Sequence, residues 1–308
     1  MIEVALMIEA QNGLNWGRWQ KLAQAAEDLG FAGLYRSDHY TNARPPDIDS
    51  LECWVSLAWL ASHTRHVEFG PLVSPLSFRH PTMLARMASA VDDLSGGRLT
   101  LGLGAGWQER EHAHYGWQLL DVPGRMERFE DGLEIVTRLF NSDRPVDYAG
   151  RYYHVQEAVL LPRPARPGGP PILIGGNGEK RTLPLVARYA AEWNGNFLPP
   201  AEFARLNARL DELLAAQNRR PADVRRSLMT GCHFGRDEEA VKSKLAARGR
   251  TADEVRAMGM IFGTANQIVE QLGWFAEAGV QRIMLQWLDL EALDDLEAMA
   301  KFVLPQVK

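Results

Sequence analysis

The sequence contains few cysteines and no long apolar run. Only Cys53 and Cys232 occur, far apart and outside any Cys-x-x-Cys spacing, which excludes a disulfide framework and a cysteine-based zinc cluster. Such sparse cysteine use fits a reducing cytoplasm. No stretch approaches the roughly 18 apolar residues that a membrane span needs, and residues 1–10 lack the basic and apolar segments of a signal peptide. We therefore expect neither a membrane anchor nor export.

An excess of basic residues is also absent. The 34 Lys and Arg residues are outnumbered by 39 Asp and Glu residues, giving a formal charge of -5. Nucleic-acid-binding proteins usually carry a basic surface, so a small-molecule partner is predicted instead of a nucleic acid. The 46% of hydrophobic residues and 24% of charged residues are typical of a globular protein.

A repeated unit of strand, turn and helix organises the chain. The crossovers between the β-rich runs are long enough for parallel pairing. The expected strands are 2–8, 31–35, 67–73, 99–103, 172–174, 191–194, 227–234 and 282–287. This α/β pattern predicts a single (β/α)8 TIM barrel over residues 1–308, and a doubly wound sheet is the competing architecture.

Residues 108–170 interrupt this repetition. A charged helix is expected over 125–140, followed by a hairpin of 146–148 and 152–161. We interpret the whole stretch as an insertion after the fourth strand. We expect it to shape the substrate pocket.

The carboxyl ends of the strands are where barrel enzymes place their chemistry. Asp38 and His39 follow the second strand. Histidine has the side-chain pKa nearest neutrality, so His39 is a candidate proton donor or acceptor. An ordinary loop hydrogen bond is the alternative.

A glycine-rich segment follows the fourth strand, and its last four residues are Gly104, Ala105, Gly106 and Trp107. It resembles the dinucleotide motif Gly-x-Gly-x-x-Gly, but Trp107 replaces the third glycine. Glycines without a Cβ would let a flat ring approach the backbone closely. A crowded barrel corner that needs small residues is the alternative.

A second glycine-rich turn, Gly175, Gly176, Asn177 and Gly178, follows the fifth strand and opens a helix. Free N–H groups at such a helix start favour an anion, most simply a phosphate. A plain turn is the alternative. Trp193, at the end of the sixth strand, is a further candidate for binding.

Residues of the metal-ligand type cluster in one short segment. Glu109, Glu111, His112 and His114 all lie within it. However, His112 and His114 are two residues apart and would diverge on a helix, so no metal site is predicted. The lack of a Gly-x-Ser-x-Gly elbow disfavours a serine hydrolase.

Many short motifs are spread over nearly the whole chain. They are Glu27-Asp28-Leu29-Gly30-Phe31, Ser37-Asp38-His39, Arg79-His80-Pro81, Asp93 to Leu99, Gly102 to Trp107 with Glu111 and Tyr115-Gly116, Glu127-Arg128-Phe129, Gly150 to Tyr153, Pro171 to Arg181, and Trp193-Asn194. Because of these motifs, the chain resembles the bacterial-luciferase-like flavin and deazaflavin oxidoreductases. Within that family it is most similar to the branch predicted to use coenzyme F420. The set is much more specific than any one motif.

The resemblance implies a flat cofactor ring across the barrel mouth. The ring would lie over a third-strand bulge with a non-prolyl cis peptide near Leu72, Val73 and Ser74. His39 would transfer a proton beside the hydride-accepting carbon, with Asp38 orienting it, and the turn from Gly175 to Gly178 would hold the phosphate. A homodimer is also implied.

The chain departs from the family pattern at two positions. Trp107 stands where related deazaflavin sugar-phosphate dehydrogenases have a glutamate, so their substrate should not be transferred. Ala191 stands where an aspartate is usual, which removes one hydrogen bond to the ring or to the protein.

Three functions remain open. The first is hydride transfer between F420 and a small organic substrate. The second is an FMN-dependent monooxygenase reaction that uses reduced flavin and oxygen. The third is a non-catalytic cofactor carrier, which would bind the cofactor tightly without turning over any electron acceptor.

Overall fold

Parallel strands form a nearly closed barrel at the centre of the molecule. The computed structural model describes residues 2–307. Nine strands follow one another in the order β3-β2-β1-β12-β10-β9-β8-β5-β4. They are β1 (Glu3–Ile8), β2 (Gly33–Arg36), β3 (Glu68–Pro71), β4 (Ser74–Pro75), β5 (Leu101–Gly104), β8 (Ile172–Gly175), β9 (Glu192–Asn196), β10 (Arg225–Phe234) and β12 (Arg282–Gln286).

Strands β3 and β4 share one position in the barrel wall. β4 pairs with β5, and a bridge between Phe69 in β3 and Leu99 joins β3 to the same neighbour. Counting β3 and β4 as one reduces the nine strands to eight positions, each of which matches an expected strand. The (β/α)8 prediction is therefore confirmed, and the doubly wound sheet is excluded.

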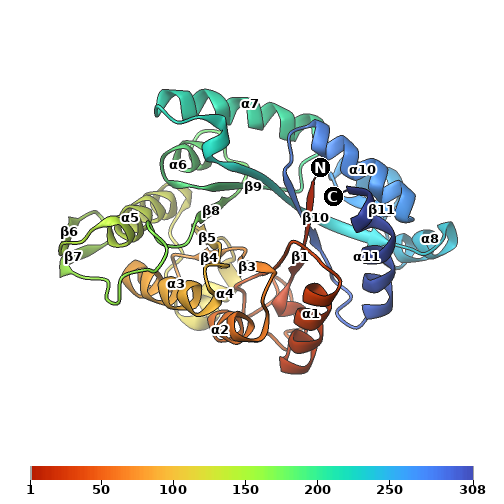
Figure 1. Ribbon diagram of the computed structural model, residues 1–308, viewed down its shortest axis with the longest axis horizontal. Coiled ribbons are helices and arrows are strands. Elements are labelled where there is room, and N and C mark those ends of the chain that lie inside the picture. The colour runs from red at the N-terminus through yellow and green to blue at the C-terminus, as the bar shows by residue number, and fades with distance from the viewer. Residues whose placement is uncertain (1, 308) are drawn as a thin grey trace.

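Helices surround the barrel on the outside (Figure 1), and the backbone N–H of Ile2 donates to the carbonyl oxygen of Val307 at 3.1 Å. The outer helices are α1 (Trp16–Asp28), α2 (Cys53–His63), α3 (Pro81–Ser95), α5 (Val122–Asn141), α6 (Thr182–Tyr189), α7 (Pro200–Ala216), α10 (Ala265–Glu277) and α11 (Leu293–Val307). Two 3-10 helices, η1 (Ala10–Asn12) and η2 (Pro221–Asp223), lie in the connections. Within residues 2–307, no helix combines the length and apolar character of a membrane span.

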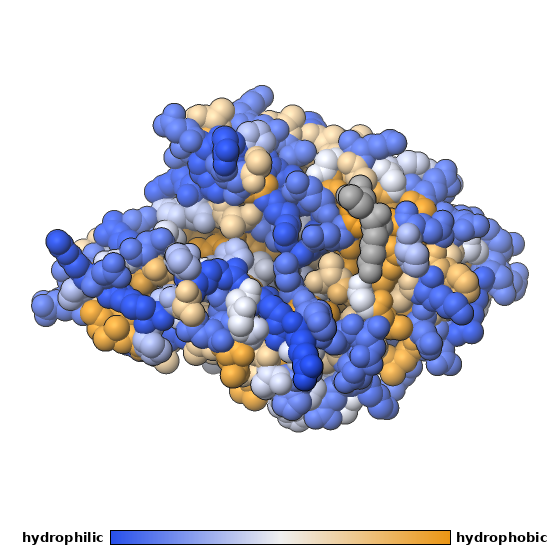
Figure 2. All heavy atoms as spheres, in the orientation of Figure 1, coloured by the Kyte–Doolittle hydropathy of each residue, from blue (hydrophilic) through white to orange (hydrophobic). Residues whose placement is uncertain are grey.

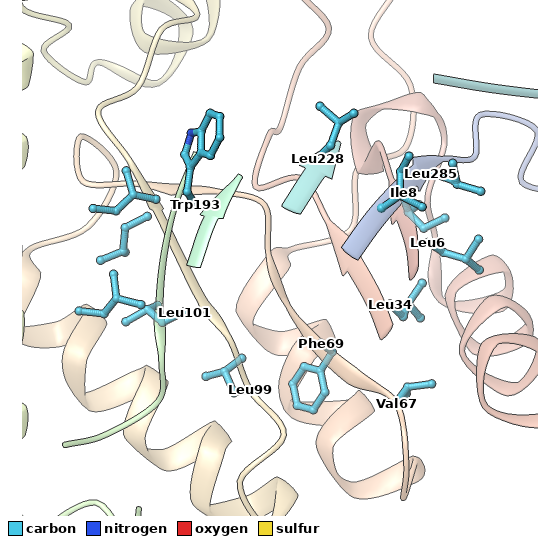
Figure 3. Packing of buried hydrophobic residues seen from close by; sticks show 14 of the residues in the cluster. Leu6, Ile8, Leu34, Val67, Phe69, Leu99, Leu101, Trp193, Leu228 and Leu285 are labelled. Atoms are coloured by element: carbon cyan, nitrogen blue, oxygen red, sulfur yellow. The ribbon is translucent and has the colours of Figure 1, made fainter. Parts of the chain in front are cut away.

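Alternation along the strands separates two apolar layers. In β1, Leu6 and Ile8 belong to the large cluster between sheet and helices, part of which is drawn in Figure 3. Ala5 and Met7 belong to a smaller cluster inside the barrel. Because successive strand residues point to opposite faces, the same short run fills both layers. Each buried large apolar side chain contributes roughly 1.5–3 kcal/mol.

The predicted insertion after the fourth strand is narrower than residues 108–170. The charged helix is present as α5, and the hairpin as β6 (Val146–Ala149) and β7 (His154–Ala158). However, α5 packs against α3 and α6, so it takes the place of the fourth outer helix. The added parts are the hairpin, which projects from one side in Figure 1, and the segment with α4 (Glu109–Tyr115).

A second added segment follows β10. It contains α8 (Glu238–Ala247), α9 (Ala252–Ala257) and the three-residue strand β11 (Ile261–Gly263), which extends the sheet only along the end of β10. The segment has its own small apolar cluster. β11 is not among the expected strands, because three residues are too few to show a strand period.

The surface seen in Figure 2 is mainly hydrophilic, and hydrophobic side chains appear on it as separate patches. This agrees with the average composition of the chain. Hydrophobic side chains that are exposed singly are usual on globular proteins. Only a cluster of them on neighbouring elements would indicate a contact surface.

Candidate active site

Cavities lie at both ends of the barrel. One of about 440 Å³ lies at the carboxyl ends of the strands, where His39, Trp107 and Gly176 contribute to its wall. The other, of about 970 Å³, lies at the opposite end, where β1 and β9 begin. Ala191 contributes to this second cavity. The departure from the family pattern at Ala191 is therefore remote from the barrel mouth.

The larger cavity borders a network that closes the barrel floor. Arg282 is almost fully buried; its Nε donates to Glu3 and one Nη to Glu68, each at 2.7 Å. The same Nη donates to the Tyr35 hydroxyl at 2.6 Å. In TIM barrels this end usually serves stability and the carboxyl end serves chemistry. The smaller cavity is therefore the candidate active site.

His39 forms a close pair with Glu111 at the smaller cavity. The imidazole Nδ1 lies 2.8 Å from Oε2 of Glu111, a fully buried side chain of α4. The other carboxylate oxygen accepts the backbone N–H groups of Tyr40 and Thr41. Because a carboxylate only accepts hydrogen bonds, Nδ1 carries a hydrogen and Nε2 is left for the cavity.

The environment of His39 favours the protonated imidazole. Burial alone would lower the pKa of His39, but the hydrogen bond and the negative charge of Glu111 outweigh burial and raise it above the usual 6.5. Glu9 and Asp38 add smaller effects in the same direction. His39 therefore keeps its proton to higher pH than an ordinary imidazole, and it faces the cavity.

The prediction that Asp38 orients His39 is wrong. The Asp38 carboxylate accepts a hydrogen bond from Ser74 Oγ at 2.6 Å and pairs with Arg79. Adjacent residues of an extended segment point to opposite sides, and the residues that line the cavity here are Ser37 and His39. Glu111 takes the role that Asp38 was expected to have.

The sequence indicated Glu111 only as a residue of the metal-ligand type and as part of the family pattern. It lies 72 residues from His39 in the chain, so no local spacing indicates their contact. The one available signal was the place of Glu111 in the family pattern, because its burial, which it shares with His112, is a property of the folded structure.

The expected bulge lies between β3 and β4. The Leu72–Val73 peptide bond is cis, as the resemblance implied, and both side chains line the cavity. Ser74 does not line it. Its hydroxyl donates to Asp38 and accepts from Trp54 Nε1 at 3.1 Å, so Ser74 supports the bulge from behind.

The glycines of β5 allow close packing of the barrel wall. A Cβ on Gly104 would lie 2.5 Å from a methyl carbon of Val73, so the crowded-corner alternative holds at this position. Gly104, Ala105, Gly106 and Trp107 nevertheless all line the cavity. The Trp107 side chain is 59% exposed and lies edge-on to His39, with ring centroids 5.6 Å apart.

The loop between β8 and α6 presents open backbone donors. Gly175 and Gly176 line the cavity. The Asn177 side chain instead bonds in both directions to the backbone of Asn196. Within residues 2–307, the N–H groups from Asn177 to Arg181 have no hydrogen-bond acceptor in the protein. Asn177 and Gly178 lie outside the cavity wall, in this row of free donors.

Trp193 does not contact the cavity, and the prediction that it does is wrong. Strand alternation turns Asn194 inward and Trp193 outward, where it is fully buried and stacks on Phe203 of α7 with centroids 4.9 Å apart. Figure 3 shows Trp193 with other residues of the large apolar cluster. Its Nε1 donates to Gly176 O at 2.9 Å, so Trp193 holds the β8–α6 loop from behind.

Comparison with known proteins identifies related sequences. The family model described as luciferase-like monooxygenase matches residues 2–254. A 4-hydroxyprotoasukamycin monooxygenase from Streptomyces nodosus subsp. asukaensis is 27% identical, with 96% of this chain and 87% of that protein covered. An F420-dependent hydroxymycolic acid dehydrogenase from Mycobacterium tuberculosis is 30% identical, but the match covers 56% of this chain and 46% of that protein.

Solved structures share the fold. An F420-dependent secondary alcohol dehydrogenase, in complex with an F420-acetone adduct, superposes with a TM-score of 0.88 at 17% sequence identity. The match covers 100% of this chain and 99% of that one. At 17% identity this similarity establishes a shared fold and nothing about the reaction.

Proposed function

This chain belongs to the luciferase-like monooxygenase family of enzymes, and we propose that it transfers a hydride between coenzyme F420 and a small organic substrate. The observation that carries the proposal is the His39–Glu111 pair. It presents a protonatable nitrogen to a cavity at the barrel mouth. Reduction of a carbonyl needs such a proton, and oxidation of an alcohol needs its removal.

The residues around the cavity fit a flat ring that carries a phosphate. Leu72 and Val73 offer an apolar wall for the ring, and the segment from Gly104 to Trp107 would border it. The free N–H groups after Gly176 would bind the phosphate. When bound, a deazaflavin would supply the hydride chemistry that side chains lack.

The protein itself would supply position and a proton. His39 would give or take the proton at the substrate oxygen through Nε2, while Glu111 fixes the ring orientation and keeps Nδ1 protonated. Such proton transfer contributes about two to four orders of magnitude to a rate. The cavity walls would keep water from the reacting atoms.

A monooxygenase that uses reduced FMN is the second candidate function. The Streptomyces nodosus relative, which is a monooxygenase, aligns with 96% of this chain. Titration of the purified protein with F420 and, separately, with FMN decides between the two. We expect F420 fluorescence to be quenched at a concentration at least tenfold lower than FMN fluorescence; the reverse order would favour the monooxygenase.

The phosphate position can be tested at Gly178. A Cβ there would lie 2.6 Å from Thr182 Oγ1, so Gly178→Val should crowd the loop and cover its free N–H groups. We expect about tenfold weaker F420 binding, as for the loss of one charge-assisted hydrogen bond. Gly273→Val is the matched control, because Gly273 faces open space. Unaltered affinity in Gly178→Val would refute this placement.

We further propose that the protein is a homodimer through the outer face of the adjoining helices α2 and α3. Val55, Met83 and Leu94 on these helices are 58%, 54% and 55% exposed. Met83→Glu should therefore produce a monomer in size-exclusion chromatography with light scattering. Phe302→Glu, on α11, should remain dimeric. A dimeric Met83→Glu variant would exclude this face.

We also propose a cytoplasmic setting. Cys53 and Cys232 are both buried and unpaired, and free thiols are usual in a reducing compartment. Fractionation of the native host would test the location directly.

A further inference from the structure

Negative charge outweighs positive charge at the cavity. The carboxylates of Glu9 and Glu111 line it, and within residues 2–307 no Lys or Arg does. His39 also lines the cavity, but its imidazole is paired with Glu111 at 2.8 Å. Glu9 is held by two neutral amides, with Gln11 Nε2 at 2.8 Å and Gln286 Nε2 at 2.7 Å. Within residues 2–307 no cationic side chain is hydrogen-bonded to Glu9, since His39 is bonded to Glu111 instead.

Two arginines close to this part of the molecule, Arg79 and Arg110, are already paired. Arg79 bonds to Asp38 and Glu52, and Arg110 bonds to Asp47. Neither guanidinium is left to bind an anion in the cavity.

His112 also lines the cavity, but its ring nitrogens are both engaged. Nδ1 lies 2.7 Å from the carbonyl oxygen of Gln108, and Nε2 lies 2.8 Å from Ser77 Oγ. The carbonyl only accepts, so Nδ1 carries the hydrogen, and Nε2 can accept from Ser77. Both ring nitrogens of His112 thus have partners within the protein, whereas Nε2 of His39 is left for the cavity.

Aromatic side chains supply much of the remaining wall. Trp107, Phe78 and Phe197 all line the cavity. Phe78 packs on Trp117 with ring centroids 4.3 Å apart, which fixes its position, whereas the Trp107 side chain is largely exposed. Exposed aromatic surface of this kind gains most from an apolar or planar partner.

From these contacts we infer that the substrate is an uncharged compound with an apolar, planar body and one carbonyl or hydroxyl oxygen, and that Glu9 rejects phosphorylated or carboxylated analogues. This inference rests on the proposed function, since it takes His39 as the partner of the reacting oxygen. An anionic group in the cavity would meet the carboxylate of Glu9, and the His39 imidazole is already paired with Glu111, so the repulsion is costly at low dielectric.

Matched pairs of probes test the inference by calorimetry on the F420-saturated protein. One pair is acetophenone and 4-acetylbenzoate, and the other is cyclohexanol and cyclohexyl phosphate. We expect the neutral member of each pair to bind at least about tenfold more tightly, as for one screened like-charge repulsion. Equal or reversed affinities, or no binding of either neutral probe, would overturn the inference.

Variants locate the origin of the selectivity. Glu9→Gln should reduce the preference for acetophenone over 4-acetylbenzoate by about tenfold, and Trp107→Lys, which adds a cation, should reverse it. Glu212→Gln, an exposed carboxylate on α7, should leave the preference unchanged. A preference that persists in both Glu9→Gln and Trp107→Lys would assign the selectivity to another feature and overturn the role of Glu9.

Failure of the proposed function gives a different result. In that case neither F420 nor FMN fluorescence changes on titration. The order of probe affinities can still be measured on the protein alone, because the charges that line the cavity belong to the chain itself.

Discussion

Replacing His39 with alanine should lower the rate of hydride transfer by about two to four orders of magnitude and leave F420 affinity unchanged. The imidazole is the ring that faces the cavity with a raised pKa, so its loss removes the proton and little of the binding surface. The rate is measured in a single turnover from the absorbance of F420, after saturation with the cofactor.

His63→Ala is the control for this substitution, because His63 is exposed on the outer surface of α2. Its turnover should equal that of the unmodified protein. If turnover survives in His39→Ala while cofactor affinity is unchanged, another group supplies the proton and the proposed role of His39 is wrong.

Replacing Glu111 with glutamine should move the alkaline limb of the pH-rate profile to lower pH. Glu111 raises the pKa of His39, so removing its charge lowers that pKa and deprotonates the acid earlier as pH rises. An opposite charge at this distance shifts a pKa by about one to three pH units, so we expect a shift of the limb within that range. The measurement is kcat against pH for carbonyl reduction, with KM followed separately.

Glu109→Gln provides the matched control, since Glu109 is exposed on the same short helix. It should keep the original profile. A Glu111→Gln variant that folds, binds F420 and retains the original alkaline limb would show that Glu111 does not control the proton on His39.

The same pair should make stability depend on pH. Because the pKa of His39 is raised in the folded state, the stabilisation is full below the unfolded pKa and is lost as pH rises through the folded pKa. The free energy of unfolding should therefore fall over that interval in the unmodified protein. In Glu111→Gln the fall should be smaller.

Local sequence was sufficient to determine the barrel and the places where chemistry could occur. The alternation of side chains along β1 places Leu6 on one face of the strand and Met7 on the other. This alternation can be recognised from the residues of the strand itself. The positions of His39 after β2 and of the glycine turn after β8 follow from the strand ends alone. The boundary of the insertion did not follow, because α5 has the same period whether or not it joins the outer ring.

Tertiary structure alone decided which side chains meet. His39 is hydrogen-bonded to the carboxylate of Glu111, which is 72 residues away in the chain. The adjacent Asp38 pairs with Arg79 instead. Trp193 was expected at the end of its strand, yet it lies near the start of β9 and packs against α7. The reason is physical: periodicity specifies the direction of a side chain relative to its own strand or helix. The partner it reaches depends on how distant elements, here α4 across the barrel mouth, pack in three dimensions.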